Sequence, residues 1–210
     1  MPLSNVQKGA IGQFAFLSTA LATGGGEVEA YVPVADNERR DAEIRHHLKS
    51  TPGVTVQVKV AFRSASYGRS RSKYLRIVFS VRVERLVHDA RFLYFFAVYN
   101  AAELRLQDPC FLIPSEIFHK IGRDGRSRNG VQWFSLNANL DPHSSDKWSR
   151  FHVAPNELGL RLLEAIDEAP LTAVRRALKS PPDAVLLWRA RRPTASRRRG
   201  KAASPPPKAH

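Results

Sequence analysis

Apolar residues recur along the chain at the spacings of helices and strands. Residues 5–22 predict an amphipathic helix that ends at Gly24. Its apolar stripe consists of Val6, Ala10, Phe14, Leu17 and Leu21. Gly9 and Gly12 each weaken such a helix by about 1 kcal/mol relative to Ala. Either glycine marks the close approach of another backbone or has no special role, and the pattern alone leaves both interpretations open.

The next three segments alternate between apolar and polar residues, which is typical of half-buried strands. They cover residues 27–34, 41–48 and 54–60. Residues 49–53 have the composition of a turn, so the last two strands are expected to form an antiparallel hairpin. If that turn is centred on Thr51, Glu43 lies opposite Lys59, and Asp41 lies one pair further toward Ala61. His46 is expected to be partly buried.

Later segments predict a mixture of further strands and helices. A strand runs from Leu75 to Val83, and residues 92–99 form a continuous apolar run that suits a strand covered on both faces. Short strands follow at residues 111–113 and 131–136, with a brief helix ending at Gly122 between them and another helix starting near Pro155. This order predicts an α/β fold with a central mixed β-sheet flanked by helices.

Composition divides the chain into a body and a tail. We expect one domain over residues 1–180, in which residues 171–179 add a last helix, and a disordered basic tail rich in Pro and Arg over residues 181–210. The net charge is +14, and residues 189–210 carry eight of the cations and no acid, which leaves +6 on the rest. A basic tail can simply be solvated, but a body that is itself basic favours nucleic acid as the partner.

Cysteine content and hydropathy exclude several classes of protein. Cys110 is the single cysteine, so neither a disulfide framework nor a cysteine metal site can form. No segment has the roughly 18 to 20 apolar residues of a membrane span. We therefore expect a buried thiol in a soluble cytoplasmic protein without a membrane partner.

The predicted hairpin carries the residues best suited to chemistry. Gln57 and Lys59 are two positions apart on one strand and so project from the same face. Asp41 is expected at the same end of the hairpin. Metal-dependent phosphodiester hydrolysis needs oxygen ligands for the cation and a positioned positive charge, and these three residues could supply both. An ordinary half-exposed hairpin shows the same polar residues, so the spacing alone does not decide between the two.

A resemblance to a known family favours the chemical interpretation. The segments are Lys8-Gly9-Ala10-Ile11-Gly12-Gln13, Val32-Pro33-Val34-Ala35-Asp36-Asn37, Asp41, and Val56-Gln57-Val58-Lys59-Val60. Together they resemble the PD-(D/E)XK nuclease superfamily with its restriction-endonuclease-like core. The branch concerned resembles group I intron homing endonucleases and Holliday junction resolvase-like proteins.

The resemblance implies a Mg²⁺- or Mn²⁺-dependent DNA endonuclease. Asp41, Gln57 and the main-chain carbonyl of Val58 would bind the metal, and Lys59 would assist catalysis. Gln57 stands where a carboxylate is commoner, and Gln13 stands where many relatives carry a glutamate. An amide oxygen brings no charge to a metal site, so a catalytically inactive DNA-binding module that keeps the fold remains the alternative.

Two basic loops are candidate nucleic-acid contacts. The first leaves the strand that bears Lys59 and carries Arg63, Tyr67, Arg69, Arg71 and Lys73, which could contact phosphates and stack on a base. The second carries Arg123, Arg126 and Arg128. The tail cannot distinguish RNA from DNA, so RNA is not excluded. Cleavage of both strands of a duplex usually needs two active sites, which leaves a homo-oligomer open as well.

Overall fold

The computed structural model describes residues 2–33, 40–66 and 72–170, and only the backbone at residues 123–126. All of these residues fall within the unit Met1–Arg175. The predicted helix at 171–179 and the basic tail lie outside the described residues, so the domain boundary at 180 stays a prediction.

The larger of two sheets has seven strands and mixed topology. Its order is β1-β2-β3-β6-β8-β11, with β7 paired to β6, and β3 and β6 are parallel. The strands are β1 (Val28–Tyr31), β2 (Ala42–His46), β3 (Val54–Ala61), β6 (Phe92–Asn100), β7 (Arg105–Leu106), β8 (Cys110–Pro114) and β11 (His152–Val153). The predicted α/β class with a central mixed sheet flanked by helices is confirmed.

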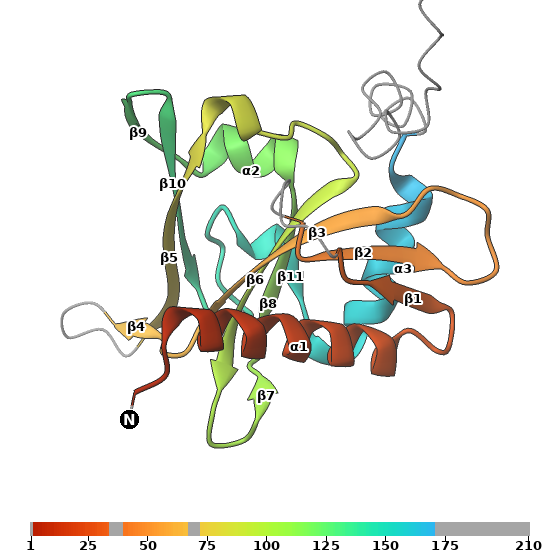
Figure 1. The fold of residues 1–210 in the computed structure, drawn as a ribbon. Coiled ribbons are helices and arrows are strands. Elements are labelled where there is room, and N and C mark those ends of the chain that lie inside the picture. The colour runs from red at the N-terminus through yellow and green to blue at the C-terminus, as the bar shows by residue number, and fades with distance from the viewer. Residues whose placement is uncertain (1, 34–39, 67–71, 171–210) are drawn as a thin grey trace, which may run out of the picture. The chain divides into compact units, whose positions relative to one another are not determined.

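A second, four-stranded antiparallel sheet has the order β4-β5-β10-β9 (Figure 1). Its strands are β4 (Ala65–Ser66), β5 (Lys73–Arg82), β9 (Arg123–Arg128) and β10 (Val131–Asn139). The sequence pattern did not predict this sheet. The segment expected to be a second basic loop, around Arg126, is instead the edge strand β9, which pairs with β10.

Helices cover the large sheet on both sides. The helices are α1 (Asn5–Thr23), α2 (Ser115–Ile121) and α3 (Leu158–Glu168), with single 3-10 turns η2 (Val83–Arg85), η3 (Ser149–Phe151) and η4 (Pro155–Glu157). Side chains of α1 and α3 share one apolar core with one face of the sheet. Phe118 of α2 joins the inner face of the second sheet in the other core.

The central strand β6 contributes to both cores. Phe95 is fully buried among residues of α1 and α3, while its neighbour Phe96 is fully buried among residues of α2, β5 and β10. Successive side chains of a strand point to opposite faces, so a strand buried on both faces must be apolar throughout. The prediction made from the continuous apolar run at residues 92–99 is confirmed.

The predicted apolar stripe of the first helix is mostly wrong. Ser4 caps α1 in a reciprocal capping box with Gln7, but Val6 and Phe14 are 83% and 69% exposed. Of the predicted stripe only Leu17 is buried. The buried positions of α1 are Gly12, Phe16, Leu17 and Ala20. Small residues let the helix lie close to β3: a Cβ built on Gly12 would come within 2.9 Å of the Val60 Cβ.

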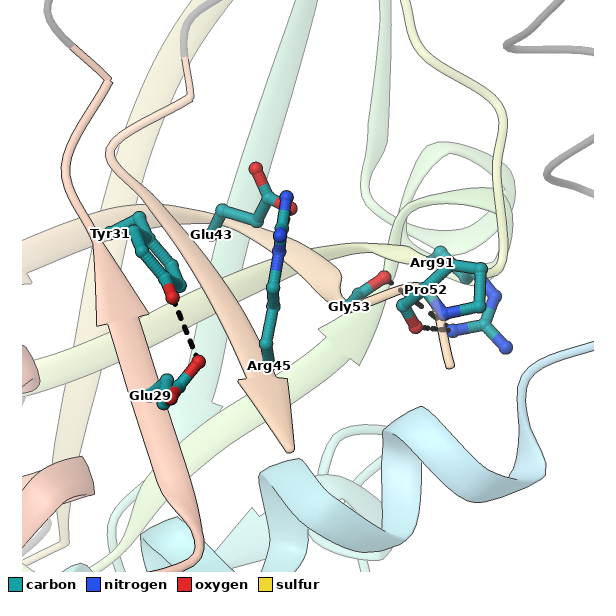
Figure 2. A network of polar contacts seen from close by, with 7 residues as sticks. All are labelled: Glu29, Tyr31, Glu43, Arg45, Pro52, Gly53 and Arg91. Carbon is teal, nitrogen blue, oxygen red and sulfur yellow. Dashed lines mark hydrogen bonds and ion pairs between the residues drawn. The ribbon is translucent and has the colours of Figure 1, made fainter. Parts of the chain in front are cut away.

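Arg91 ties the start of β3 to the C-terminal end of α3. Its side chain is 7% exposed, and its guanidinium donates hydrogen bonds to the carbonyls of Pro52 and Gly53 (Figure 2). It also donates to the carbonyl of Ile166 at 3.2 Å and to that of Ala169 at 2.7 Å. A cation favours the C-terminal end of a helix because the last carbonyls lack intrahelical partners.

Candidate functional site

Asp41 lies immediately before β2, beside the middle of β3. Its backbone N–H donates to the carbonyl of Val56 at 3.1 Å, which extends the β2–β3 pairing by one residue. Its carboxylate oxygen Oδ2 accepts a hydrogen bond from the N–H of Val58 at 2.7 Å. The side-chain amide of Gln13, on α1, donates to the backbone carbonyl of Asp41. Asp41 is therefore fixed from both the sheet and the helix.

Gln57 and Lys59 project from the face of β3 that looks toward the second sheet. The other face of β3, with Val54 and Val56, contributes to the core shared with α1 and α3. Gln57 is 3% exposed, and the Lys59 Nζ lies 5.7 Å from the centre of the Phe79 ring on β5. Residues 57–59 and Asp41 meet at one end of the hairpin, and their predicted catalytic and metal-binding roles stay predictions.

The register of the hairpin differs from the predicted one. Glu43 is paired with Thr55, not with Lys59, and its carboxylate accepts from the Arg45 Nε at 2.7 Å. The prediction was wrong because it centred the turn on Thr51, whereas β2 already ends at His46 and the connection starts there. In this register Asp41 reaches Val58 rather than Ala61. His46 is 7% exposed, as expected.

The main-chain carbonyl of Val58 points to the same edge of β3 as Asp41. Within a strand, the N–H and C=O of one residue point to the same side, and the sides alternate from residue to residue. The carbonyl of Val56 and the N–H of Val58 both bond to Asp41. The carbonyl of Val58 therefore also faces the side on which Asp41 lies.

A polar network continues from this site along β2 and β1. Tyr31 donates to the Glu29 carboxylate at 2.8 Å (Figure 2), and His47 Nδ1 lies 2.6 Å from the same carboxylate. The hydrogen bond with His47, followed by that from Tyr31, holds the pKa of Glu29 below its ordinary value. The Arg45 guanidinium lies 5.1 Å from the centre of the Tyr31 ring. Hydrogen-bond donors therefore occupy the Glu29 and Glu43 carboxylates of this surface.

A chain of polar side chains begins beside Gln57 on the neighbouring strand, at the buried Tyr94 and His119, and ends at the exposed His88. Tyr94 of β6 is the register partner of Gln57, and its hydroxyl lies 3.0 Å from the His119 Nε2 of α2. The Nδ1 atoms of His119 and His88 are 3.3 Å apart. Burial, and then the nearby His88, lowers the pKa of His119 to about 4. Sequence reasoning missed this chain, because Tyr94 stands in an apolar run and His88 in a segment that looked like a simple turn.

The first predicted basic loop is described only at its ends. Arg63 is exposed just after β3, and Lys73 is exposed at the start of β5, where it pairs with Ser66 of β4. Tyr67, Arg69 and Arg71 lie outside the described residues. A role of this segment in nucleic-acid binding stays a prediction.

Within the described ranges, no group of three or more His, Cys, Asp or Glu side chains could hold a metal ion. Over the same ranges, none of the helices is long and apolar enough to pass through a membrane. Cys110 is fully buried, as predicted, and burial raises the pKa of its thiol.

Comparison with known proteins gives distant structural likeness only. No family model matches the chain, and no curated protein matches its sequence. Among solved structures, the chain is similar to a bacterial homing endonuclease, I-Ssp6803I, at 16% identity and a TM-score of 0.45. That match covers 84% of this chain and 99% of the endonuclease. A likeness this distant transfers no activity, so function has to be argued from the site itself.

Proposed function

We propose that the protein is a DNA endonuclease that uses Mg²⁺ or Mn²⁺ at the site formed by Asp41, Gln57, Val58 and Lys59. The observation that carries the proposal is the 2.7 Å hydrogen bond from the Val58 N–H to the Asp41 carboxylate. That contact holds the carboxylate next to the strand that presents Gln57 and Lys59 on one face. The net charge of +14 favours a polyanionic substrate.

The donor set fits a hard divalent cation. A carboxylate, a side-chain amide and a main-chain carbonyl offer only oxygen ligands, which Mg²⁺ and Mn²⁺ prefer. The Asp41 Oδ2 accepts from the Val58 N–H, and a carboxylate can bind a divalent cation through one oxygen or both. Asp41, Gln57 and the Val58 carbonyl would hold the ion. When bound, such an ion stabilises the charge that develops on a phosphodiester and lowers the pKa of bound water.

Lys59 would act as the positioned cation of the site. Its stem crosses toward the second sheet, and its ammonium lies 5.7 Å from the centre of the Phe79 ring, a contact that orients the side chain. An ammonium held at this place stabilises negative charge on a phosphate oxygen and orients an attacking water. Gln57 contributes no charge, so the site carries one negative charge from Asp41 and one positive charge from Lys59.

Two substitutions test the proposal. Asp41→Asn keeps an oxygen that can accept from Val58 but removes the charge, and Lys59→Met keeps the apolar stem over Phe79. Each is expected to lower the rate of Mg²⁺-dependent cleavage of a supercoiled plasmid and of a linear duplex by at least 100-fold, with an unchanged melting temperature. Glu43→Gln is the matched control, because the Glu43 carboxylate is already bound by Arg45, and its cleavage rate should stay within about twofold of wild type. Equal cleavage by all four proteins would refute the site.

A second candidate function is DNA binding without catalysis. The observation that favours it is that the proposed metal ligands include one carboxylate only, while Gln13 is engaged in a structural hydrogen bond to the Asp41 carbonyl. Weak ligand charge lowers affinity for Mg²⁺. Titration calorimetry with Mg²⁺ and Mn²⁺ up to millimolar concentration distinguishes the two. No metal binding together with salt-sensitive DNA binding would favour the binding module over the nuclease.

A further inference from the structure

The four-stranded sheet has an outer face of unusual composition. Leu75 on β5 and Leu136 on β10 are fully buried at inner positions, so the alternate positions of both strands point outward. The outward positions, called here the outer sheet face, are Tyr74, Arg76, Val78, Ser80 and Arg82 on β5 and Val131, Trp133, Ser135, Asn137 and Asn139 on β10. Figure 1 shows this sheet as the outermost layer on its side of the described part of the chain.

The strand register groups these side chains into rows across the sheet. Arg76 is paired with Asn137 at one end. At the other end Arg82, Val131 and Arg128 are neighbours across β5, β10 and β9. Six residues of a strand separate Arg76 from Arg82, a distance of about 20 Å. Between the two rows, Val78 and Trp133 are 43% and 39% exposed.

The ten outward positions of β5 and β10 include Arg76 and Arg82 and no Asp or Glu. Elsewhere the exposed arginines Arg45, Arg105 and Arg161 each bind a glutamate of the same segment at 2.8 Å or less. On the outer sheet face Arg82 forms an ion pair with Glu84 of η2, at 3.5 Å and with both side chains more than 60% exposed. Such a pair is weak and is readily exchanged for a phosphate.

We propose that the outer sheet face binds duplex DNA, with β5 and β10 against the major groove. The choice of DNA as the partner rests on the proposed function. Arg76 at one end of the ribbon and Arg82 and Arg128 at the other suit phosphates, while Asn137 has the groups that read an adenine edge, and Val78 suits a thymine methyl group. β4 pairs only with Lys73 and Tyr74 of β5, and β9 pairs only with residues 131–134 of β10, so the middle of the sheet is two strands wide. A two-stranded ribbon fits the major groove of B-form DNA, which is about 12 Å wide, but not the deep, narrow groove of A-form RNA.

Binding experiments with the full chain test this surface. The probe is a fluorescent DNA duplex titrated in EDTA at several salt concentrations, so that no cleavage occurs. The triple variant R76A/R82A/R128A is expected to lower the slope of log K against log salt by about 2.7, since each phosphate contact contributes about 0.9. The matched control R105A/R150A/R161A removes the same charge from β7, η3 and α3, and its slope should equal that of wild type.

Each outcome bears on the proposal. Equal losses in the two triple variants would mean that general charge, not this face, attracts DNA, and an unchanged slope in both would place the DNA elsewhere. If unlabelled duplex RNA displaced the fluorescent DNA duplex as strongly as unlabelled duplex DNA does, the choice of DNA as the partner would be wrong. Val78→Glu, which adds a negative charge at an exposed position, is expected to weaken binding at least tenfold, with folding checked by circular dichroism. The titration in EDTA measures binding and not cleavage, so a failure of the catalytic proposal leaves this result unaffected.

Discussion

Arg91 provides a stringent test of how the hairpin that bears the site is held in place. Its buried guanidinium donates to four backbone carbonyls in two separate segments, Pro52–Gly53 and Ile166–Ala169. Burial lowers the pKa of Arg91, which shows that the cation is partly stripped of water. The cost of desolvating the guanidinium therefore offsets part of the stability that its hydrogen bonds contribute to the folded state.

Arg91→Met keeps the apolar stem but leaves these carbonyls without their donor. Each buried acceptor left unsatisfied costs about 1 to 3 kcal/mol, and the bond to Gly53, at 3.5 Å, adds little. Three carbonyls lose a strong hydrogen bond, and water can replace part of that hydrogen bonding. The free energy of unfolding is therefore expected to fall by about 3 to 5 kcal/mol. The effect is expected mainly as faster unfolding of the β3–α3 junction.

Urea denaturation followed by circular dichroism measures the effect. The control is Arg45→Met, which removes an arginine on the neighbouring strand β2 (Figure 2). The Arg45 side chain is 52% exposed and pairs with Glu43, so its loss should cost under about 1 kcal/mol. If Arg91→Met also cost less than about 1 kcal/mol, the four hydrogen bonds would not be what holds the start of β3 to the end of α3.

Three further predictions concern packing and pH. Phe16→Ala should cost about 3 to 5 kcal/mol and Phe14→Ala under 1 in urea denaturation, since Phe16 is fully buried and Phe14 is 69% exposed. Gly159→Ala should destabilise by about 1 to 3 kcal/mol because its Cβ would lie 2.4 Å from backbone atoms of α1, whereas Gly9→Ala, with open space around the Cβ, should stabilise by about 0.5 to 1 in the same assay. Because the pKa of His119 is lowered to about 4 from 6.5, the unfolded chain binds the proton first, and stability should fall by at most about 3 kcal/mol as the pH falls from 6.5 to 4. Thermal melts across this range should show a flatter profile for His119→Gln than for wild type.

Sequence reasoning worked where a pattern depends on alternation within one strand. The apolar run at residues 92–99 and the burial of His46 were predicted correctly, because a strand's faces follow directly from its sequence. The register of β2 against β3 was not predictable in the same way. The register depends on where the strands end. Residues 49–53 have the composition of a short turn, whereas the connection between β2 and β3 is longer and begins after His46.

The errors elsewhere have two physical causes. The buried face of α1 is built from small residues such as Gly12 and Ala20 around Phe16, so a count of large apolar residues pointed to the exposed face instead. The edge strand β9 has the Arg, Gly and Ser content of a loop, and its strand structure comes from pairing with β10, a contact between chain segments that local propensity does not contain. The sequence pattern was enough to predict that Asp41 lies beside β3. The contact between Tyr94 and His119 could not be predicted in this way, because it depends on how α2 packs on the sheet.

The two proposed surfaces share one strand, and this makes their independence testable. On β5, Phe79 points inward and contacts Lys59, while its neighbours Val78 and Ser80 point outward. Side chains on opposite faces of a strand do not touch, so substitutions on the two faces should act additively on free energies. A protein that combines Asp41→Asn with R76A/R82A/R128A should therefore have the reduced salt slope of the triple variant and the catalytic defect of Asp41→Asn at saturating DNA. If the triple variant instead lost cleavage at saturating DNA while Asp41 was intact, the outer sheet face would be coupled to the site through β5, and the separation of binding from catalysis would be wrong.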